Sequence, residues 1–414
     1  MKITGVSTAV VEANFDYTFV RVQLDDGTYG IGECFFAPGL PAIARDVGTL
    51  LIGGDPRDIR TLTTRMHLAI SASSGSGHAG AALHAVSGLE TALWDLSGKI
   101  YGEPIWRILG GSFRQEIPVY ADLHAGEALV SVDSLLRSRR PFWASDDGVT
   151  SIGDFYWTGE TTDHVSNEAI LKRVQTAADN GFGCVKLDID VFEHGRLATD
   201  ATLPSATALR LAESASWLRS ETNRAVEIAY DCHWRFDIPT ARALNGALAE
   251  AAPLWLEDPV PPSGRALAAV AEAGPIAIAS GENAYRLEGI EELATHGGLH
   301  IATPDVQKVG GIREAQQIGD WCSRTGIGFA PHCIASPIGF MAAVHVMATI
   351  PSVMFLEFHG SDLPFWSDLV AEEVIRDGKV ALPDRPGLGV TLNMDLVRQY
   401  SRPGEPVFEE GPAN

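Results

Sequence analysis

Three carboxylates stand at regular intervals in the second half of the chain. Asp231, Glu257 and Glu282 each follow a short apolar run, with spacings of 26 and 25 residues. If each run is a strand of one parallel sheet, the three side chains converge at one edge, where their charges repel each other unless a cation lies between them. Oxygen ligands alone select a hard ion, so we expect Mg²⁺, or Mn²⁺ in its place, with positions left for substrate and water.

Two further residues are of the types that form a proton-transfer dyad, and they follow successive strand-like runs. Asp305 ends Thr303-Pro304-Asp305, and His332 ends Ala330-Pro331-His332. An isolated His332 would more often be a core histidine, but a neighbouring carboxylate can fix the imidazole tautomer and raise its basicity. The next strand-like run ends Leu356-Glu357-Phe358-His359, which adds another carboxylate and another hydrogen-bonding group.

A lysine and an imidazole follow two earlier runs. One run ends Val185-Lys186-Leu187-Asp188, and His233 comes two residues after Asp231. The plain alternative for Lys186 is an exposed lysine at a strand end, and for any single carboxylate a solvated loop acid or a helix N-cap. Three carboxylates in register make a shared site the better interpretation.

Eight β-rich runs would position these residues. The candidate strands are 117–121, 184–189, 227–232, 254–257, 276–280, 300–302, 328–331 and 354–358. Amphipathic segments lie between them, such as the one with Ala208, Leu211, Ala215 and Leu218 on one face. Repeated strand–helix alternation predicts a parallel sheet, and eight strands favour closure into a (β/α)8-type barrel, with all strand ends at one mouth.

Two segments depart from this alternation. Residues 1–115 start with strand-like runs around the turn Asp25-Asp26-Gly27 and then become helical, with apolar residues three and four apart between Leu83 and Leu93, which predicts an α+β unit. Residues 123–168 interrupt the barrel, 116–360, after its first strand. Such an insertion would overhang the mouth as a lid, or else form an oligomer contact or a surface loop.

Composition excludes several classes of protein. Apolar residues make up 45% of the 414 and charged residues 20%, which indicates a core-forming chain. The net charge of −22 argues against nucleic acid as a partner. The N-terminus lacks a signal-peptide pattern and the apolar stretch 334–350 is too short to cross a membrane, so we expect a cytoplasmic protein with a buried helix there. Five cysteines without a C-x-x-C pair predict buried free thiols.

Taken together, these motifs resemble the enolase superfamily, in its mandelate racemase subgroup. The segments similar to that family are 87–99 (SGLETALWDLSGK), 102–104, 109–111, 306–312 and 386–390. The resemblance implies a (β/α)7β modified TIM barrel with an α+β capping domain, built from residues 1–115 and a return of the chain over 361–414. It also implies that cap loops near 14–18 and 35–39 meet the substrate, and that the chain forms a homo-oligomer.

Family chemistry, as the resemblance implies it, begins with removal of the proton α to a carboxylate by a Lys or His base, while Mg²⁺ stabilises the enediolate. Such a proton is too weakly acidic for a base near neutrality unless the developing charge is neutralised. Racemases of the subgroup carry Lys-x-Lys on the second strand, whereas this chain has Lys186-x-Asp188. The added His233 resembles the galactonate and mannonate dehydratase branches, where a third-strand histidine assists departure of the 3-hydroxyl.

Our hypothesis is a Mg²⁺-dependent dehydratase that converts a small-molecule sugar acid, an aldonate or aldarate, into its 2-keto-3-deoxy product. His332, oriented by Asp305, would remove the α-proton. His233 would protonate the leaving hydroxyl, and Lys186 would neutralise the substrate carboxylate or act as the alternate base.

Two further roles and two alternatives complete the hypothesis. Glu357 would bind the enediolate edge, as a donor only if it is protonated, and Asp188 would contact the substrate. A racemase, epimerase or lactone cycloisomerase on the same metal site is the alternative, since Lys186 and His332 would lie on opposite sides of the substrate. A non-catalytic barrel used as a binding or scaffold protein is the third interpretation, which the intact metal carboxylates disfavour.

Overall fold

The computed structural model describes most of the chain. The described residues are 1–13, 15–71, 79–123, 166–189, 192–193, 196–197, 201–360 and 363–408. The predicted insertion 123–168 therefore lies almost wholly outside the described residues, and its expected role as a lid stays a prediction.

The N-terminal part is a three-stranded antiparallel meander covered by helices. Its elements are β1 (Ile3–Val11), β2 (Tyr17–Leu24), β3 (Tyr29–Cys34), α1 (Leu40–Gly48), α2 (Ile59–Ile70), α3 (Ala79–Tyr101) and α4 (Ile105–Ile108). Helix α3 lies directly on β3, because Gly30 and Gly32 leave room for it. A Cβ at Gly32 would lie 1.9 Å from the carbonyl oxygen of Gly88. The predicted hairpin around Asp25-Asp26-Gly27 and the predicted helix are both present.

Eight parallel strands form the barrel. They are β4 (Glu116–Leu123), β5 (Cys184–Asp188), β8 (Glu227–Asp231), β9 (Leu256–Glu257), β10 (Ile278–Ser280), β11 (Ile301–Ala302), β12 (Gly328–Phe329) and β13 (Leu356–Phe358), hydrogen-bonded in this order with β13 beside β4. Two backbone hydrogen bonds, from Met354 to Phe329 and from Glu357 to Pro331, close the ring between β12 and β13. The eight predicted strands are thus confirmed, although most are shorter than the sequence indicated.

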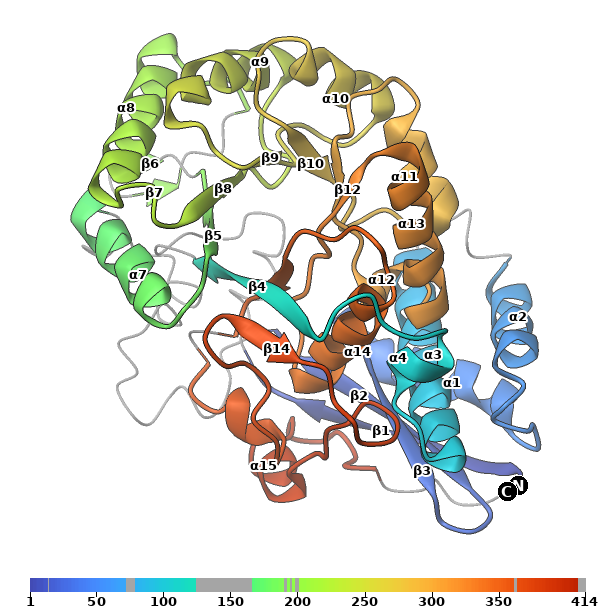
Figure 1. Cartoon of the computed structure of the whole chain (residues 1–414). Helices are drawn as coiled ribbons and strands as arrows, with labels where there is room; N and C mark the ends of the chain where they lie inside the picture. Colours follow the sequence, from blue (N-terminus) through green and yellow to red (C-terminus); the bar gives the residue numbers. More distant parts are fainter. Residues whose placement is uncertain are drawn as a thin grey trace.

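Helices surround this ring on its outside, as Figure 1 shows. They are α7 (Asn167–Asp179), α8 (Ser205–Glu221), α9 (Ile238–Ala247), α10 (Gly264–Ala271), α11 (Arg286–Ala294), α12 (Val306–Val309), α13 (Ile312–Thr325) and α14 (Pro337–Ala348). Every residue of α14 is buried, which confirms the helix predicted within 334–350. All five cysteines are buried and free, as predicted. No helix among the described residues combines the length and apolar character needed to cross a membrane.

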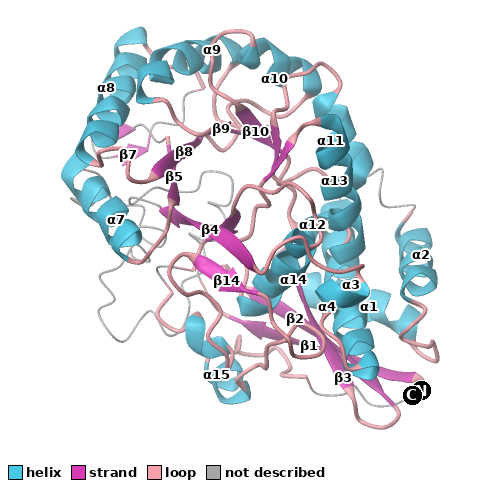
Figure 2. Cartoon of the chain, viewed as in Figure 1, coloured by secondary structure: helices cyan, strands magenta, loops and turns pink. Residues whose placement is uncertain are grey.

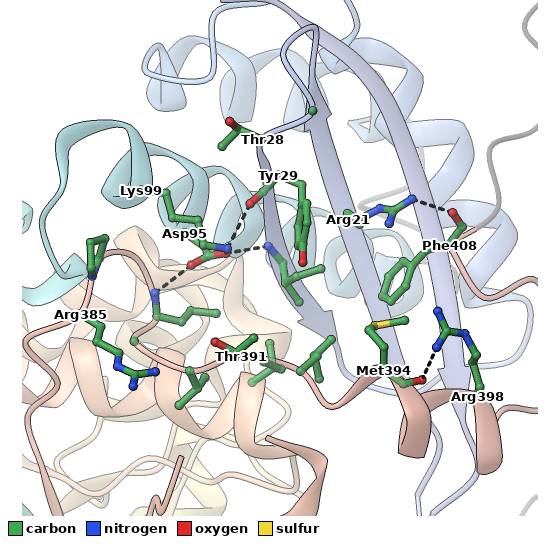
Figure 3. A pocket seen from close by; sticks show the side chains of 18 residues that line it. Arg21, Thr28, Tyr29, Asp95, Lys99, Arg385, Thr391, Met394, Arg398 and Phe408 are labelled. Atoms are coloured by element: carbon green, nitrogen blue, oxygen red, sulfur yellow. Dashed lines mark hydrogen bonds and ion pairs between the residues drawn. The ribbon is translucent and has the colours of Figure 1, made fainter. Parts of the chain in front are cut away.

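The C-terminal part returns to both earlier parts of the molecule (Figures 1 and 2). Strand β14 (Lys379–Ala381) pairs antiparallel with β4, and after α15 (Met394–Gln399) the chain runs beside β1, where Phe408 N–H donates to the Thr8 carbonyl. Between this return and the cap hairpin lies a pocket of about 630 Å³ (Figure 3). The basic side chains around that pocket are Arg21, Lys99, Arg385 and Arg398.

Buried carboxylates join the cap to the N-termini of barrel helices. Glu90 on α3 accepts hydrogen bonds from the backbone N–H groups of Ile312 and Arg313, 2.8 and 3.1 Å away, at the start of α13. Glu33 at the end of β3 accepts from the N–H groups of Ser336 and Gly339 at the start of α14. Helix N-termini favour negative charge, so these contacts hold the cap against the barrel. Burial nevertheless raises the pKa of both carboxyls to about 7.

Candidate active site

The three predicted metal carboxylates converge at the carboxyl ends of neighbouring strands. Asp231 ends β8, Glu257 ends β9, and Glu282 follows β10 by two residues. One carboxylate oxygen from each lies within 4.8 Å of the others, and all three side chains are buried. Glu257 Oε1 accepts no hydrogen bond within the described part of the chain. A buried cluster of carboxylate oxygens fits a hard divalent cation, because such charges need a counter-charge when they are removed from water.

Charge around the cluster separates the pKa values of its members. Burial raises the pKa of Glu257 well above its usual value. Burial also acts on Glu282, but the nearby His332 and Lys308 outweigh it and lower the pKa of Glu282 to about 2. In the same way His233 and Lys186 lower the pKa of Asp231. The cluster therefore carries negative charge near neutral pH.

His332 and Asp305 form the predicted dyad beside this cluster. His332 Nδ1 lies 2.7 Å from Asp305 Oδ2, while its Nε2 lies 3.4 Å from Glu282 Oε2. The other Asp305 oxygen accepts from the N–H of Gln307 at the start of α12, which fixes the carboxylate. Burial alone would lower the pKa of His332, but the negative charges of Glu282 and Glu357, with the hydrogen bond to Asp305, raise it.

Lys186 lies on the opposite side of the cluster, on β5. Its ammonium is 2.8 Å from Glu357, 3.0 Å from Asp231 and 3.4 Å from Glu257. Although burial lowers the pKa of a lysine, these charges raise the pKa of Lys186 well above its usual value. Glu357 also accepts from the N–H of Cys333, and burial raises its pKa.

His233 stands beside Asp231 in an unusual backbone conformation. Its φ is +47° and that of Trp234 is +58°, both in the left-handed region that residues with a Cβ seldom adopt. This turn brings the imidazole within 3.9 Å of Asp231 and 3.8 Å of Asp188. Burial lowers the pKa of His233, but the two carboxylates outweigh it and raise that pKa to about 9. Asp188 thus faces His233, and its expected contact with the substrate stays a prediction.

Two polar groups at this mouth were missed by reasoning from the sequence. Lys308 on α12 lies 3.3 Å from Glu282, with its ammonium 3.9 Å from the centre of the Phe35 ring of the cap. The only signal for Lys308 in the sequence was its place in segment 306–312, which is similar to the family. Asp122 was missed because the first strand was expected to end at 121, whereas β4 continues to Leu123.

Comparisons with known proteins agree with this fold. Residues 4–110 match the family model described as the N-terminal domain of mandelate racemase / muconate lactonizing enzyme, and residues 169–396 match the model described as enolase C-terminal domain-like. The chain belongs to the mandelate racemase / muconate lactonizing enzyme family of the enolase superfamily, and its fold is that family's modified TIM barrel with a capping domain.

Three relatives illustrate this level of similarity, and two of them are named for an activity. A D-xylonate dehydratase of Haloferax volcanii is 32% identical, with 99% of this chain and 91% of that protein covered. A D-galactarolactone cycloisomerase of Agrobacterium fabrum is 27% identical over 97% of this chain and all of that protein. The crystal structure of a mandelate racemase/muconate lactonizing enzyme-like protein from Rubrobacter xylanophilus has a TM-score of 0.86 at 33% identity, covering 98% of this chain and 99% of that one.

Family membership makes the chain an enzyme. Its dehydratase relatives are lyases. Its acidic cluster has the composition of a divalent-metal site.

Proposed function

We propose that this chain is a Mg²⁺-dependent acid-sugar dehydratase, which removes water across C2 and C3 of an aldonate or aldarate. The observation that carries the proposal is the placement of two different imidazoles beside one carboxylate cluster, His332 near Glu282 and His233 near Asp231. Elimination requires a base for the α-proton and an acid for the leaving hydroxyl, whereas racemisation requires a base on each face. The names of the dehydratase relatives support the same reaction.

His332 is the proposed base. Donation of its Nδ1–H to Asp305 leaves the lone pair on Nε2, the nitrogen that faces the carboxylate cluster. The negative charges that raise its pKa also strengthen it as a proton acceptor. Asp231, Glu257 and Glu282 would hold Mg²⁺, which supplies positive charge for the negative charge that develops on the substrate carboxylate as the α-proton leaves.

His233 is the proposed acid. With a pKa of about 9 it carries a proton at neutral pH. The electron pair of the broken C2–H bond forms the C2=C3 double bond, the C3–O bond breaks, and the hydroxyl leaves as water with the proton of His233. The resulting enol tautomerises to the 2-keto-3-deoxy acid.

The remaining residues have supporting roles in the proposal. Lys186, held protonated by three carboxylates, would neutralise the substrate carboxylate and is poorly suited to act as a base. Glu357 would hold the Lys186 ammonium in place through the 2.8 Å ion pair. It would donate a hydrogen bond to the substrate only if it is protonated, the form that burial favours by raising its pKa. Asp188 would orient His233, and its contact with substrate stays a prediction. We also expect a homo-oligomer and a cytoplasmic location.

The test is an assay of the purified protein with a panel of diastereomeric aldonates and aldarates, first with Mg²⁺ and then with EDTA, with 2-keto acids detected as semicarbazones. A Mg²⁺-dependent 2-keto acid from one or a few sugar acids is the expected result. Deuterium uptake at the α-carbon without a 2-keto acid would contradict the proposal and favour an epimerase. Consumption of a sugar lactone without loss of water would favour a cycloisomerase, the activity named for the Agrobacterium fabrum relative.

A further inference from the structure

One buried pair of polar residues at the barrel mouth has no part in the chemistry above. Asp122 is the next-to-last residue of β4, and His359 directly follows β13. His359 Nε2 lies 3.8 Å from Asp122 Oδ2, with side chains that are each 3% exposed. An aspartate and a histidine are rarely so deeply buried unless they have polar partners or a ligand to bind.

Strand alternation directs both side chains to the inside of the barrel. Asp122 pairs in register with Lys186 on β5, whose ammonium lies among the inward carboxylates. His359 comes two residues after Glu357, which also faces inward, while Phe358 between them packs outward against Trp366. Residues two apart on a strand share a face, so Asp122 and His359 form the outer layer of the mouth.

The order of the strands places this pair across the mouth from the metal ligands. In a ring of eight, β13 is opposite β9, which carries Glu257, and β4 is opposite β10, after which Glu282 follows. A substrate whose carboxylate and 2-hydroxyl are held at the cluster would therefore extend its other carbons toward β13 and β4. The proton-transfer residues His332 and His233 lie to either side of that path.

The chemistry of the pair suits a sugar hydroxyl. A hydroxyl can donate to the carboxylate of Asp122 and accept from the imidazole of His359, with its oxygen about 2.8 Å from both. Phe15 of the cap lies edge-on to His359, with ring centres 5.4 Å apart, and Phe36 lies 5.0 Å from Phe15. These rings supply an apolar surface next to the polar pair, the combination found in small-molecule sites that orient a ligand through a few polar groups.

We propose that Asp122 and His359 form a subsite for the hydroxyl groups of the substrate beyond C3, and that this subsite selects the length and hydroxyl configuration of the sugar acid. The inference rests on the proposed function, because it assumes that the carboxylate end of the substrate is bound at the metal cluster. It assigns specificity, rather than proton transfer, to a pair that lies outside the metal and acid–base groups.

The experiment compares a long and a short substrate in matched variants. His359→Leu removes the hydrogen-bonding groups, and His359→Gln retains a donor. The ratio of kcat/KM for the best aldonate of the panel to that for glycerate, which has no hydroxyl beyond C3, should fall roughly 10- to 100-fold in His359→Leu through loss of a hydrogen bond in a dry site. The loss should appear mainly in KM, and His359→Gln should recover part of it.

A second pair of variants and a matched control complete the test. Asp122→Ala should lower the same ratio, and Asp122→Asn, which retains an acceptor, should lower it less. His296→Leu makes the same chemical change at an exposed histidine and should leave the ratio at the wild-type value. A ratio that stays unchanged in His359→Leu and Asp122→Ala would overturn the inference, whether neither substrate is affected or both lose activity equally.

Binding measurements separate the failure of this inference from that of the proposed function. If wild-type protein dehydrates no sugar acid, the proposed function fails, and calorimetric titration of the Mg²⁺-loaded protein with the same panel still tests the subsite. Tighter binding of long acids than of glycerate, lost in His359→Leu, would support the subsite. Equal affinities for long and short acids would overturn it.

Discussion

His332 Nδ1 lies 2.7 Å from Asp305 Oδ2, and the other ring nitrogen of His332 lies 3.4 Å from Glu282 Oε2. One imidazole, after β12, thus connects a buried carboxylate at the end of the preceding strand, β11, to the candidate metal cluster. The hydrogen bond to Asp305 decides which nitrogen holds the proton, so the nitrogen toward the cluster is the one that can accept another.

Replacement of His332 tests its role as base. We expect His332→Asn to lower α-proton exchange with solvent deuterium by about 10² to 10⁴, the usual contribution of a positioned acid or base. Asp305→Asn should lower it less and shift the pH profile, because the imidazole keeps its place but loses its fixed tautomer. Lys186→Met, which removes the alternate candidate base, serves as the comparison variant. Exchange at the native rate in His332→Asn would remove His332 from this role.

Replacement of His233 should separate the two halves of the reaction. We expect His233→Asn to lower formation of the 2-keto acid by about 10² or more while α-deuterium exchange continues, because the base remains and the leaving-group acid is lost. Proton NMR of the substrate in D₂O measures exchange, and semicarbazone absorbance measures the product. Equal loss of both signals would instead indicate that His233 takes part in substrate binding or in proton removal.

Mg²⁺ should stabilise the folded chain through the three carboxylates. A ligand that binds only the folded state at 100 times its dissociation constant adds about 2.7 kcal/mol to the free energy of unfolding. We expect Mg²⁺ to raise the melting temperature of the wild type and to have little effect on Glu257→Gln, since Glu257 contributes one carboxylate oxygen to the cluster. An equal rise in both proteins would place the ion elsewhere.

The pKa of Glu33 predicts how the stability of the cap depends on pH. The folded state holds this carboxyl at a pKa of about 7, above its ordinary 4.5, so between these values the folded chain binds more protons than the unfolded chain. Its contribution to stability therefore falls as pH rises from about 5 to about 7 and is constant above that range. We expect the free energy of unfolding of the wild type, relative to Glu33→Gln, to fall by about 3 kcal/mol over this window in urea titrations. A difference independent of pH would contradict the prediction.

A glycine in the cap should tolerate no side chain. Gly32→Ala would place a methyl group 1.9 Å from the Gly88 carbonyl oxygen in α3, and overpacking of this kind costs about 1 to 3 kcal/mol or more. Gly5→Ala in β1 is the control, because nothing lies within 4 Å of the added carbon. Equal midpoints of urea unfolding for the two variants would show that α3 moves away freely.

The predicted strands and the predicted convergence of the site side chains agree with the structure for one physical reason. In a parallel barrel every strand ends at the same face, so the residue types that follow apolar runs could be brought together by topology alone. For this reason Asp231, Glu257 and Glu282 could be expected in one cluster, and Asp305 beside His332. Domain boundaries at 115 and 360 and the roles of the site residues stay predictions.

Contacts between distant segments could not be derived in the same way. Lys308 on α12 contacts the Phe35 ring of the cap. Glu90 accepts a hydrogen bond from the start of α13, over 220 residues away in the chain. The left-handed turn at His233 sets which carboxylates its imidazole faces, and no local pattern marked it.

The sequence by itself determined the class of fold and the three carboxylates of the candidate metal site, because both follow from short-range alternation and spacing. Only the tertiary structure decided that Asp188 faces His233, that Lys186 is held by three carboxylates, and that Asp122 meets His359 across the seam between the first and last strands. Such contacts depend on the register of strands and on ring closure, which join residues that are far apart in the chain.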